Sequence, residues 1–195
     1  MTGPIAYLTG EYPRATDTFI QREVSGLRDC GIKVLTCSIR KTGAEHIVGD
    51  EQRREAKQTF YVLNAAKKPL QLIRCHFSAI ARSPGRYFKG FKLAIKTRPA
   101  GLKSLLYQLF YFIEAVVLAD HLHKNGVKQL HNHIAKSSCT VAMLASEVSG
   151  IPFSFTLHGP DIFFEPHKWR LDEKIARARF VACISHYCRS QAMAF

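Results

Sequence analysis

Several common sequence signatures are missing from this chain of 195 residues, and each absence excludes a class of protein. The six cysteines form no C-x-x-C pair and have no regular spacing, which argues against a zinc site and a disulfide framework. The N-terminus, MTGPIAYLTGEYP, has no basic stretch followed by a long apolar one, so it lacks the pattern of a secretion signal. The most apolar segment, 105–119, is interrupted by Gln108 and Glu114 and is shorter than the roughly 20 residues of a membrane span. We therefore expect a cytoplasmic protein.

The best-known nucleotide and hydrolase fingerprints are also absent. No G-x-G-x-x-G follows the first predicted strand, and no G-x-x-x-x-G-K-[ST] occurs, so neither a dinucleotide enzyme nor a P-loop NTPase is indicated. G-x-S-x-G is missing as well, which argues against the nucleophile of an α/β-hydrolase.

Acidic residues are absent from 58 to 113, although the chain as a whole carries a net charge of +13. Residues 50–103 hold thirteen Lys or Arg against three acidic residues, so ten of the thirteen net positive charges lie there. One interpretation is a solvated helical face. The other is a surface that lies on an anionic membrane, because Phe77, Tyr87, Phe88 and Phe91 are interleaved with the basic residues.

What the sequence does contain is an alternation of strand and helix patterns. Strands are predicted at 4–9, 32–39, 59–64, 127–132, 153–158 and 180–185, and helices at 17–31, 104–124, 135–150 and 172–179. In the first helix, Asp17 or Thr18 is the predicted cap, Thr18-x-x-Gln21 fits a capping box, and Gly31 ends the helix. The pattern predicts one α/β domain over 1–195, a doubly wound, mostly parallel Rossmann-like sheet with helices on both faces. A basic helical insertion at about 65–103, broken at Pro84-Gly85 and Pro99, completes the expected architecture.

Polar residues follow four of the predicted strands. Thr9-Gly10-Glu11-Tyr12 follows the first, His131-Asn132-His133 ends the fourth, His158-Gly159-Pro160-Asp161 follows the fifth, and Ser185-His186 follows the sixth. Ligands of open parallel sheets bind outside the carboxyl ends of the strands, so these groups are expected at one edge.

The two histidines of the H-x-H pair have competing interpretations. They could ligate a metal, but no third ligand stands at a suitable spacing, so no metal site is expected. Alternatively, one of them faces inward and satisfies a backbone carbonyl. Asp161 could serve only as a helix cap. His158 is the strongest candidate for ligand contact, because Gly159 beside it leaves open space.

Four segments in order resemble a known family. YPRATDTFIQREVSGLRDCGIKV, QLHNHIA, GIPFSFTLHGPDIF and VACISHYCRSQ resemble the N-terminal half of family 4 glycosyltransferases, most closely bacterial exopolysaccharide enzymes of the colanic-acid type. The resemblance covers most of the chain except about 41–100. It implies the GT-B architecture, in which this chain is the acceptor-side lobe and the donor-binding C-terminal lobe is absent; the uncapped segment at the C-terminus is read as a cut.

The resemblance also implies roles for individual residues. His158 matches the family's first-lobe histidine, which faces the donor sugar or its phosphate, and Asp161 stands in the same turn; both are predicted to be catalytic. Gly10, Glu11 and Thr18 match the acceptor-side loop, although Glu11 and Tyr12 stand where many relatives have a second glycine. His133 matches the floor of the cleft, and Ser185 completes the predicted substrate-binding set.

The predicted function is therefore retaining, metal-independent transfer from a nucleotide-diphosphate sugar to a lipid-linked or saccharide acceptor, in exopolysaccharide or cell-envelope polysaccharide biosynthesis. No cofactor is expected, the fragment alone is expected to be inactive, and residues 65–103 are candidates for contact with the inner membrane face. Two alternatives stay open. One is a basic nucleic-acid-binding module, although the charge lies away from the polar edge and no such motif occurs. The other is a free-standing flavodoxin-like nucleotide or metal binder.

Overall fold

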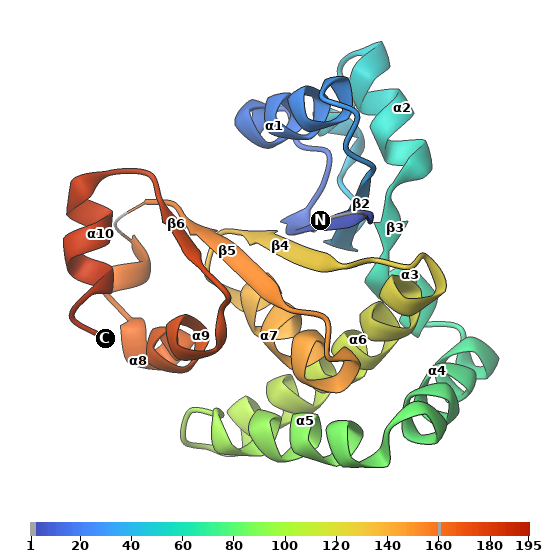
Figure 1. Ribbon diagram of the computed structural model, residues 1–195, viewed down its shortest axis with the longest axis vertical. Helices are drawn as coiled ribbons and strands as arrows, with labels where there is room; N and C mark the ends of the chain where they lie inside the picture. Colours follow the sequence, from blue (N-terminus) through green and yellow to red (C-terminus); the bar gives the residue numbers. More distant parts are fainter. Residues whose placement is uncertain (1–2, 160) are drawn as a thin grey trace.

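The protein is built on one six-stranded parallel sheet (Figure 1). The computed structural model describes residues 3–159 and 161–195, and for residue 161 the backbone alone. The strand order is β3-β2-β1-β4-β5-β6, and every paired strand is parallel to its neighbour. The strands are β1 (Ile5–Glu11), β2 (Val34–Arg40), β3 (Phe60–Tyr61), β4 (Gln129–His133), β5 (Phe153–Leu157) and β6 (Val181–Cys183). The predicted doubly wound α/β fold is confirmed.

Helices lie on both sides of this sheet (Figure 1). They are α1 (Thr18–Asp29), α2 (Asp50–Gln58), α3 (Val62–Ala66), α4 (Pro69–Arg82), α5 (Pro84–Lys96), α6 (Leu102–Lys124), α7 (Ser137–Ser149), α8 (Pro166–Trp169), α9 (Leu171–Arg177) and α10 (His186–Ala192), with short 3-10 turns at Ala44–His46 and Asp161–Phe163. The α1 and α2 helices cover one side, and α6 and α7 cover the other. The strands β2 and β3 lie on one side of β1, and β4, β5 and β6 lie on the other. The strand order therefore reverses between β1 and β4. That reversal is where ligands bind in folds of this class.

The start of α1 is confirmed in position, because its N-cap is Asp17, but the Asp17 side chain makes no capping hydrogen bond. Gln21 instead donates from Nε2 to the carbonyl oxygen of Arg14, 2.7 Å away, so the predicted capping box is wrong. The predicted end is confirmed: Gly31 adopts φ +79°, the left-handed conformation that suits glycine after a helix. Ile20 and Val24, one turn apart, bury the apolar face of α1 against the sheet.

The α6 and α7 helices form the centre of the core. By length and composition α6 could cross a membrane, since the whole helix runs for 23 residues and so extends beyond the apolar segment 105–119. Its second half, however, is enclosed: every residue from Ala115 to Asp120 is buried, and α6 packs closely along α7. We therefore describe α6 as a core helix whose first half reaches the surface.

The insertion between β3 and β4 consists mainly of α4, α5 and the first half of α6. Its predicted breaks are confirmed at Ser83, between α4 and α5, and near Pro99, between α5 and α6. The third strand is shorter than predicted, because residues from Val62 onward turn into α3 and pack against α6.

Candidate functional site

His133 and His158 meet at the carboxyl end of the sheet. Nδ1 of His133 lies 3.0 Å from Nε2 of His158. The pairing of β4 with β5 explains this contact, because His133 lies opposite Thr156 in the parallel register and His158 follows directly after β5. His133 is fully buried, whereas His158 is partly exposed and packs against the ring of Phe19, with centroids 4.8 Å apart. The predicted gathering of histidines at this edge is therefore present, with His158 outermost.

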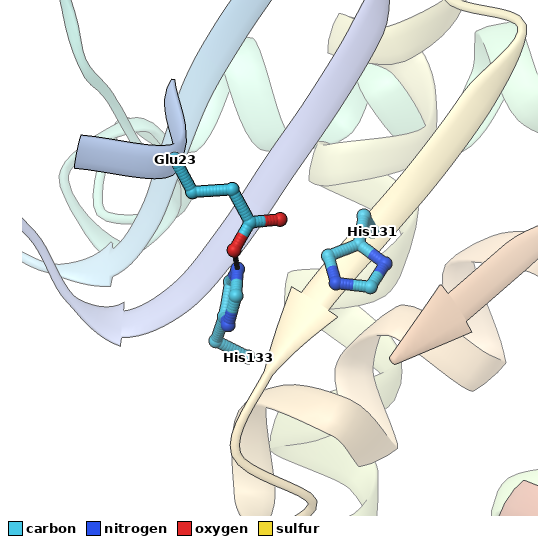
Figure 2. Close-up of side chains that lie close together, drawn as sticks. All are labelled: Glu23, His131 and His133. Atoms are coloured by element: carbon cyan, nitrogen blue, oxygen red, sulfur yellow. Dashed lines mark ion pairs between the residues drawn. The ribbon is translucent and has the colours of Figure 1, made fainter. Parts of the chain in front are cut away.

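The carboxylate of Glu23 on α1 lies beside His133 (Figure 2). Oε2 of Glu23 lies 3.5 Å from Nε2 of His133, and its other oxygen accepts a 2.5 Å hydrogen bond from the hydroxyl of Tyr7 on β1. The distance to His133 is longer than an ordinary hydrogen bond, and Nε2 of His133 has no hydrogen-bond partner among the residues described. The side chain of Glu23 is 42% exposed, so it closes the cluster on the solvent side.

Burial sets the charge of these imidazoles. Burial and, to a smaller extent, the nearby His158 lower the pKa of His133 to about 4. Burial also lowers the pKa of His158, although the carboxylates of Glu23 and Asp17 oppose this shift. Both rings are therefore neutral at pH 7. The pKa of Tyr7 is raised, first by burial and then by its hydrogen bond to Glu23, so Tyr7 remains a donor.

This arrangement favours one distribution of protons. The negative charge of Glu23 favours a proton on Nε2 of His133, since a donor is stabilised beside a carboxylate. Nδ1 of His133 then accepts from Nε2–H of His158. Nδ1 of His158 is left with its lone pair, so the outermost ring can accept a proton or a hydrogen bond from a ligand.

Glu23, His131 and His133 could hold a metal ion, since one ligand atom from each lies within 4.8 Å of the others. Glu23 lies in a helix more than 100 residues before the H-x-H pair, so the local spacing around the two histidines does not indicate this third ligand. His131, however, already uses both ring nitrogens, at 2.8 Å from Oγ of Ser154 and 2.9 Å from Oγ1 of Thr156. A metal would have to displace a hydroxyl group. Both histidines are buried, as expected for an inward-facing ring, but among the described residues their ring nitrogens contact side chains, so the predicted backbone carbonyl partner is wrong.

A pocket of about 210 Å³ opens beside the histidine cluster, at the point where the strand order reverses. We call it the switch pocket. Gly10 and Glu11 line it from the end of β1, and no atom lies within 4 Å of where a side chain on Gly10 would start. Asp17, which also lines it, is close enough to His158 to affect the pKa of that histidine. The predicted Gly10 and Glu11 therefore share one hollow with Asp17, and His158 is not among the residues that line it.

The remaining predicted residues lie elsewhere. Thr18 is exposed at the first position of α1 and does not line the switch pocket. Ser185 is the N-cap of α10, where its Oγ accepts a 3.1 Å hydrogen bond from the amide of Cys188, and it lines a separate hollow beside β6. The side chain of Asp161 lies outside what the structure describes, and its catalytic role stays a prediction.

The structure adds residues to the edge that sequence patterns did not single out. Arg14, Arg40, Glu114, Lys136, Ser137 and Ser138 all line the switch pocket. The pocket at this edge thus holds three basic side chains, Arg14, Arg40 and Lys136, together with three acidic ones, Glu11, Asp17 and Glu114. Ile134 in the same wall has φ +70°, a strained conformation for a β-branched residue of the kind that concentrates at functional sites. Arg40 could have been found from the sequence, because it directly follows a predicted strand. No local pattern marks Glu23 or Glu114.

Comparison with known proteins adds no assignment: no family model matches the chain, and no curated protein matches it.

Proposed function

We propose that this chain is the acceptor-side lobe of a glycosyltransferase that uses a nucleotide-diphosphate sugar. The single observation that carries the proposal is the contact between His133 and His158 beside the switch pocket. It supports the proposal because two motifs 25 residues apart in the sequence, each resembling a family 4 motif, meet at the edge where this fold binds ligands. The acceptor would be a saccharide or a lipid-linked saccharide.

In this proposal His158 contacts the donor sugar at the cleft. Glu23 and His133 hold its ring in position and leave Nδ1 free to accept a hydrogen bond from a sugar hydroxyl. The nucleotide diphosphate would be held mainly by a second lobe, which lies outside these 195 residues. Interactions that form only in the transition state raise the rate, so fixing this imidazole before substrate arrives is the contribution assigned to the buried pair.

The proposal includes the cytoplasmic face of an anionic membrane as a partner. Large apolar side chains are exposed on the insertion, among them Leu70, Ile73 and Phe77 of α4 and Phe88 and Phe91 of α5. Within each helix they recur at spacings of three or four residues, so each set lies on one helical face. Basic residues accompany them and acidic ones do not occur from 58 to 113, which suits anionic lipid headgroups around inserted aromatic rings.

The test is a transfer assay with the complete product of the gene that encodes this chain. Radiolabelled UDP-glucose, UDP-galactose, UDP-N-acetylglucosamine, GDP-mannose and GDP-fucose are each offered with a lipid extract from the source cells. We expect labelled sugar to appear in the lipid or polysaccharide fraction from at least one donor, and none with the 195-residue chain alone. Transfer by the chain alone would overturn the assignment to one lobe, and the absence of transfer from every donor by the complete product would overturn the function.

A further inference from the structure

Two buried oxygen atoms on α6 have no hydrogen-bond partner among the described residues. They are Oε1 of Gln108 and Oε2 of Glu114, in side chains that are only 6% and 7% exposed. Leaving such a group unpaired away from water destabilises the folded protein, so buried polar atoms are nearly always paired. Two unpaired acceptors on one helix therefore indicate groups that accept hydrogen bonds from a ligand.

Each orphaned residue lines a pocket, and the two pockets share a wall. Glu114 lines the switch pocket, and Gln108 lines a second pocket of about 470 Å³ along the first half of α6. Tyr111 lines both pockets. We call the two together the α6 groove; it runs from Gly10 and Glu11 at the sheet edge, past Tyr111, to Trp169 of α8.

The second pocket has aromatic walls. Tyr107 and Tyr111 stack one turn apart on α6, with ring centroids 6.4 Å apart and planes at 20°. Trp169 lies in the wall of the same pocket, and Lys103 and Lys168 also line it. Faces of aromatic rings next to isolated hydrogen-bond acceptors suit a ligand with apolar C–H faces and donating O–H edges.

We propose that the α6 groove binds the saccharide part of the acceptor, with a hydroxyl group donating to Glu114, another donating to Gln108, and sugar rings against Tyr107, Tyr111 and Trp169. This inference rests on the proposed function, since it names the class of molecule that the lobe receives. The free saccharide and the lipid-linked saccharide share this chemistry.

The two orphaned atoms of α6 favour a ligand that donates hydrogen bonds, whereas Nε of Arg14, which also has no hydrogen-bond partner among the described residues and lines the switch pocket, is a donor. A carboxylate and an amide oxygen accept hydrogen bonds, and a phosphate offers further acceptors instead of donors. The volume of the switch pocket points the same way, because about 210 Å³ is below the 300–1,000 Å³ or so of typical ligand sites and suits one sugar ring better than a nucleotide.

The chain carries its own probe for this test, since Trp169 is its single tryptophan. The emission of Trp169 is followed while the 195-residue chain is titrated with methyl glycosides of glucose, galactose, mannose, fucose and N-acetylglucosamine, and with inorganic phosphate as a comparison. We expect a saturable change with at least one glycoside and none with phosphate. The variants E114Q and Q108L should weaken that binding about 5- to 30-fold, the equivalent of one or two lost hydrogen bonds. The variant E147Q, a Glu-to-Gln change on α7 outside the groove, should bind like the wild type.

The outcomes separate this inference from the proposed function, because binding by this chain needs no donor. If glycosides bind and the complete gene product transfers nothing, the transferase proposal fails and the groove stands. If transfer occurs while E114Q leaves the KM for the acceptor unchanged, the groove assignment fails and the transferase stands. If no glycoside affects Trp169 in a folded chain, or if E114Q and E147Q bind alike, the groove assignment is overturned.

Discussion

Nζ of Lys174 in α9 donates a 2.8 Å hydrogen bond to the carbonyl oxygen of Ala135, in the loop that follows β4. A second bond of 2.9 Å runs from the same nitrogen to the carbonyl of Lys136. The lysine is fully buried and lies against the ring of Trp169. This loop also contains the strained Ile134 and forms one wall of the switch pocket. A buried ammonium group thus fixes the backbone at the edge of the sheet where ligands are expected.

Replacing Lys174 by methionine should destabilise the protein by roughly 1–3 kcal/mol, because two carbonyl groups lose their buried donor. Urea unfolding at pH 7 measures the change. The matched control is K168M on the neighbouring α8, where the ammonium group is half exposed and pairs with Glu165 at the surface. That variant should stay within about 0.5 kcal/mol of the wild type. Equal stability of K174M and K168M would contradict the role given to Lys174.

Lys174 is an example of a contact that the sequence did not predict. Hydrophobic periodicity predicted nearly every strand, and the strand ends correctly brought His133 to His158, because the carboxyl ends of parallel strands share an edge. Periodicity tells which face of a helix is buried, but not which loop or strand that face meets. For this reason no sequence pattern distinguishes Glu23 or Lys174 from the other polar residues of their helices. The segment from Val62 reads as a strand by composition, and packing against α6 makes it a helix.

The variant H158A in the complete gene product should lower turnover roughly 10- to 100-fold, the effect of one or two hydrogen bonds that form in the transition state. Folding should be preserved, because His158 is only partly buried. Circular dichroism checks the fold, and H167A, a change at an exposed histidine of α8, is the control. Unchanged turnover in H158A would remove His158 from the site.

The buried histidines predict a loss of stability in acid. Burial lowers the pKa of His131 and His133 to about 4, against about 6.5 in the unfolded chain. Protons then bind the unfolded state more readily, so stability is complete above pH 6.5 and falls as the pH drops toward 4. Each shift corresponds to at most roughly 3 kcal/mol. Urea unfolding between pH 7.5 and pH 5 should show this loss.

The variant H131Q should have a shallower pH dependence over the same range, because one of the two buried imidazoles is gone. H186Q, at an exposed position of α10, should keep the wild-type slope. A wild-type stability that stays constant from pH 7.5 to pH 5 would show that these rings are solvated.

The insertion should bind vesicles of phosphatidylcholine and phosphatidylglycerol, and bind phosphatidylcholine alone much less. The double variant K89E/K92E on α5 should reduce binding at least tenfold, since each basic residue near an anionic surface contributes about 1 kcal/mol. R22E/K33E reverses two exposed charges at α1 and the following loop, and should have little effect. Cosedimentation measures both. Tighter, salt-sensitive binding to mixed oligonucleotides than to anionic vesicles would support the nucleic-acid alternative instead.

Glu114 should make the protein less stable at alkaline pH. Burial raises the pKa of this carboxyl to about 7, and the guanidinium of Arg40 on β2 only partly opposes the shift. Arg14, Glu11 and Lys136 also face the same pocket, and Tyr111 does so from α6 itself. Below about pH 4.5 the group is protonated in both states and has no effect. As the pH rises from 4.5 through 7, the unfolded state loses its proton first, and the folded state loses up to roughly 3 kcal/mol of stability.

The variant E114Q removes this ionisation and should therefore melt at a higher temperature than the wild type at pH 8, with little difference near pH 4.5. E147Q, where the carboxylate pairs with Arg177 at the surface, should show no such gain. A residue retained only for structure would not be stabilised by a neutral replacement, whereas a site residue trades stability for binding. Higher stability together with weaker glycoside binding in E114Q is the combination that the α6 groove requires. Lower stability of E114Q at pH 8 would mean that the carboxylate of Glu114 is paired within the protein and is not available to a ligand.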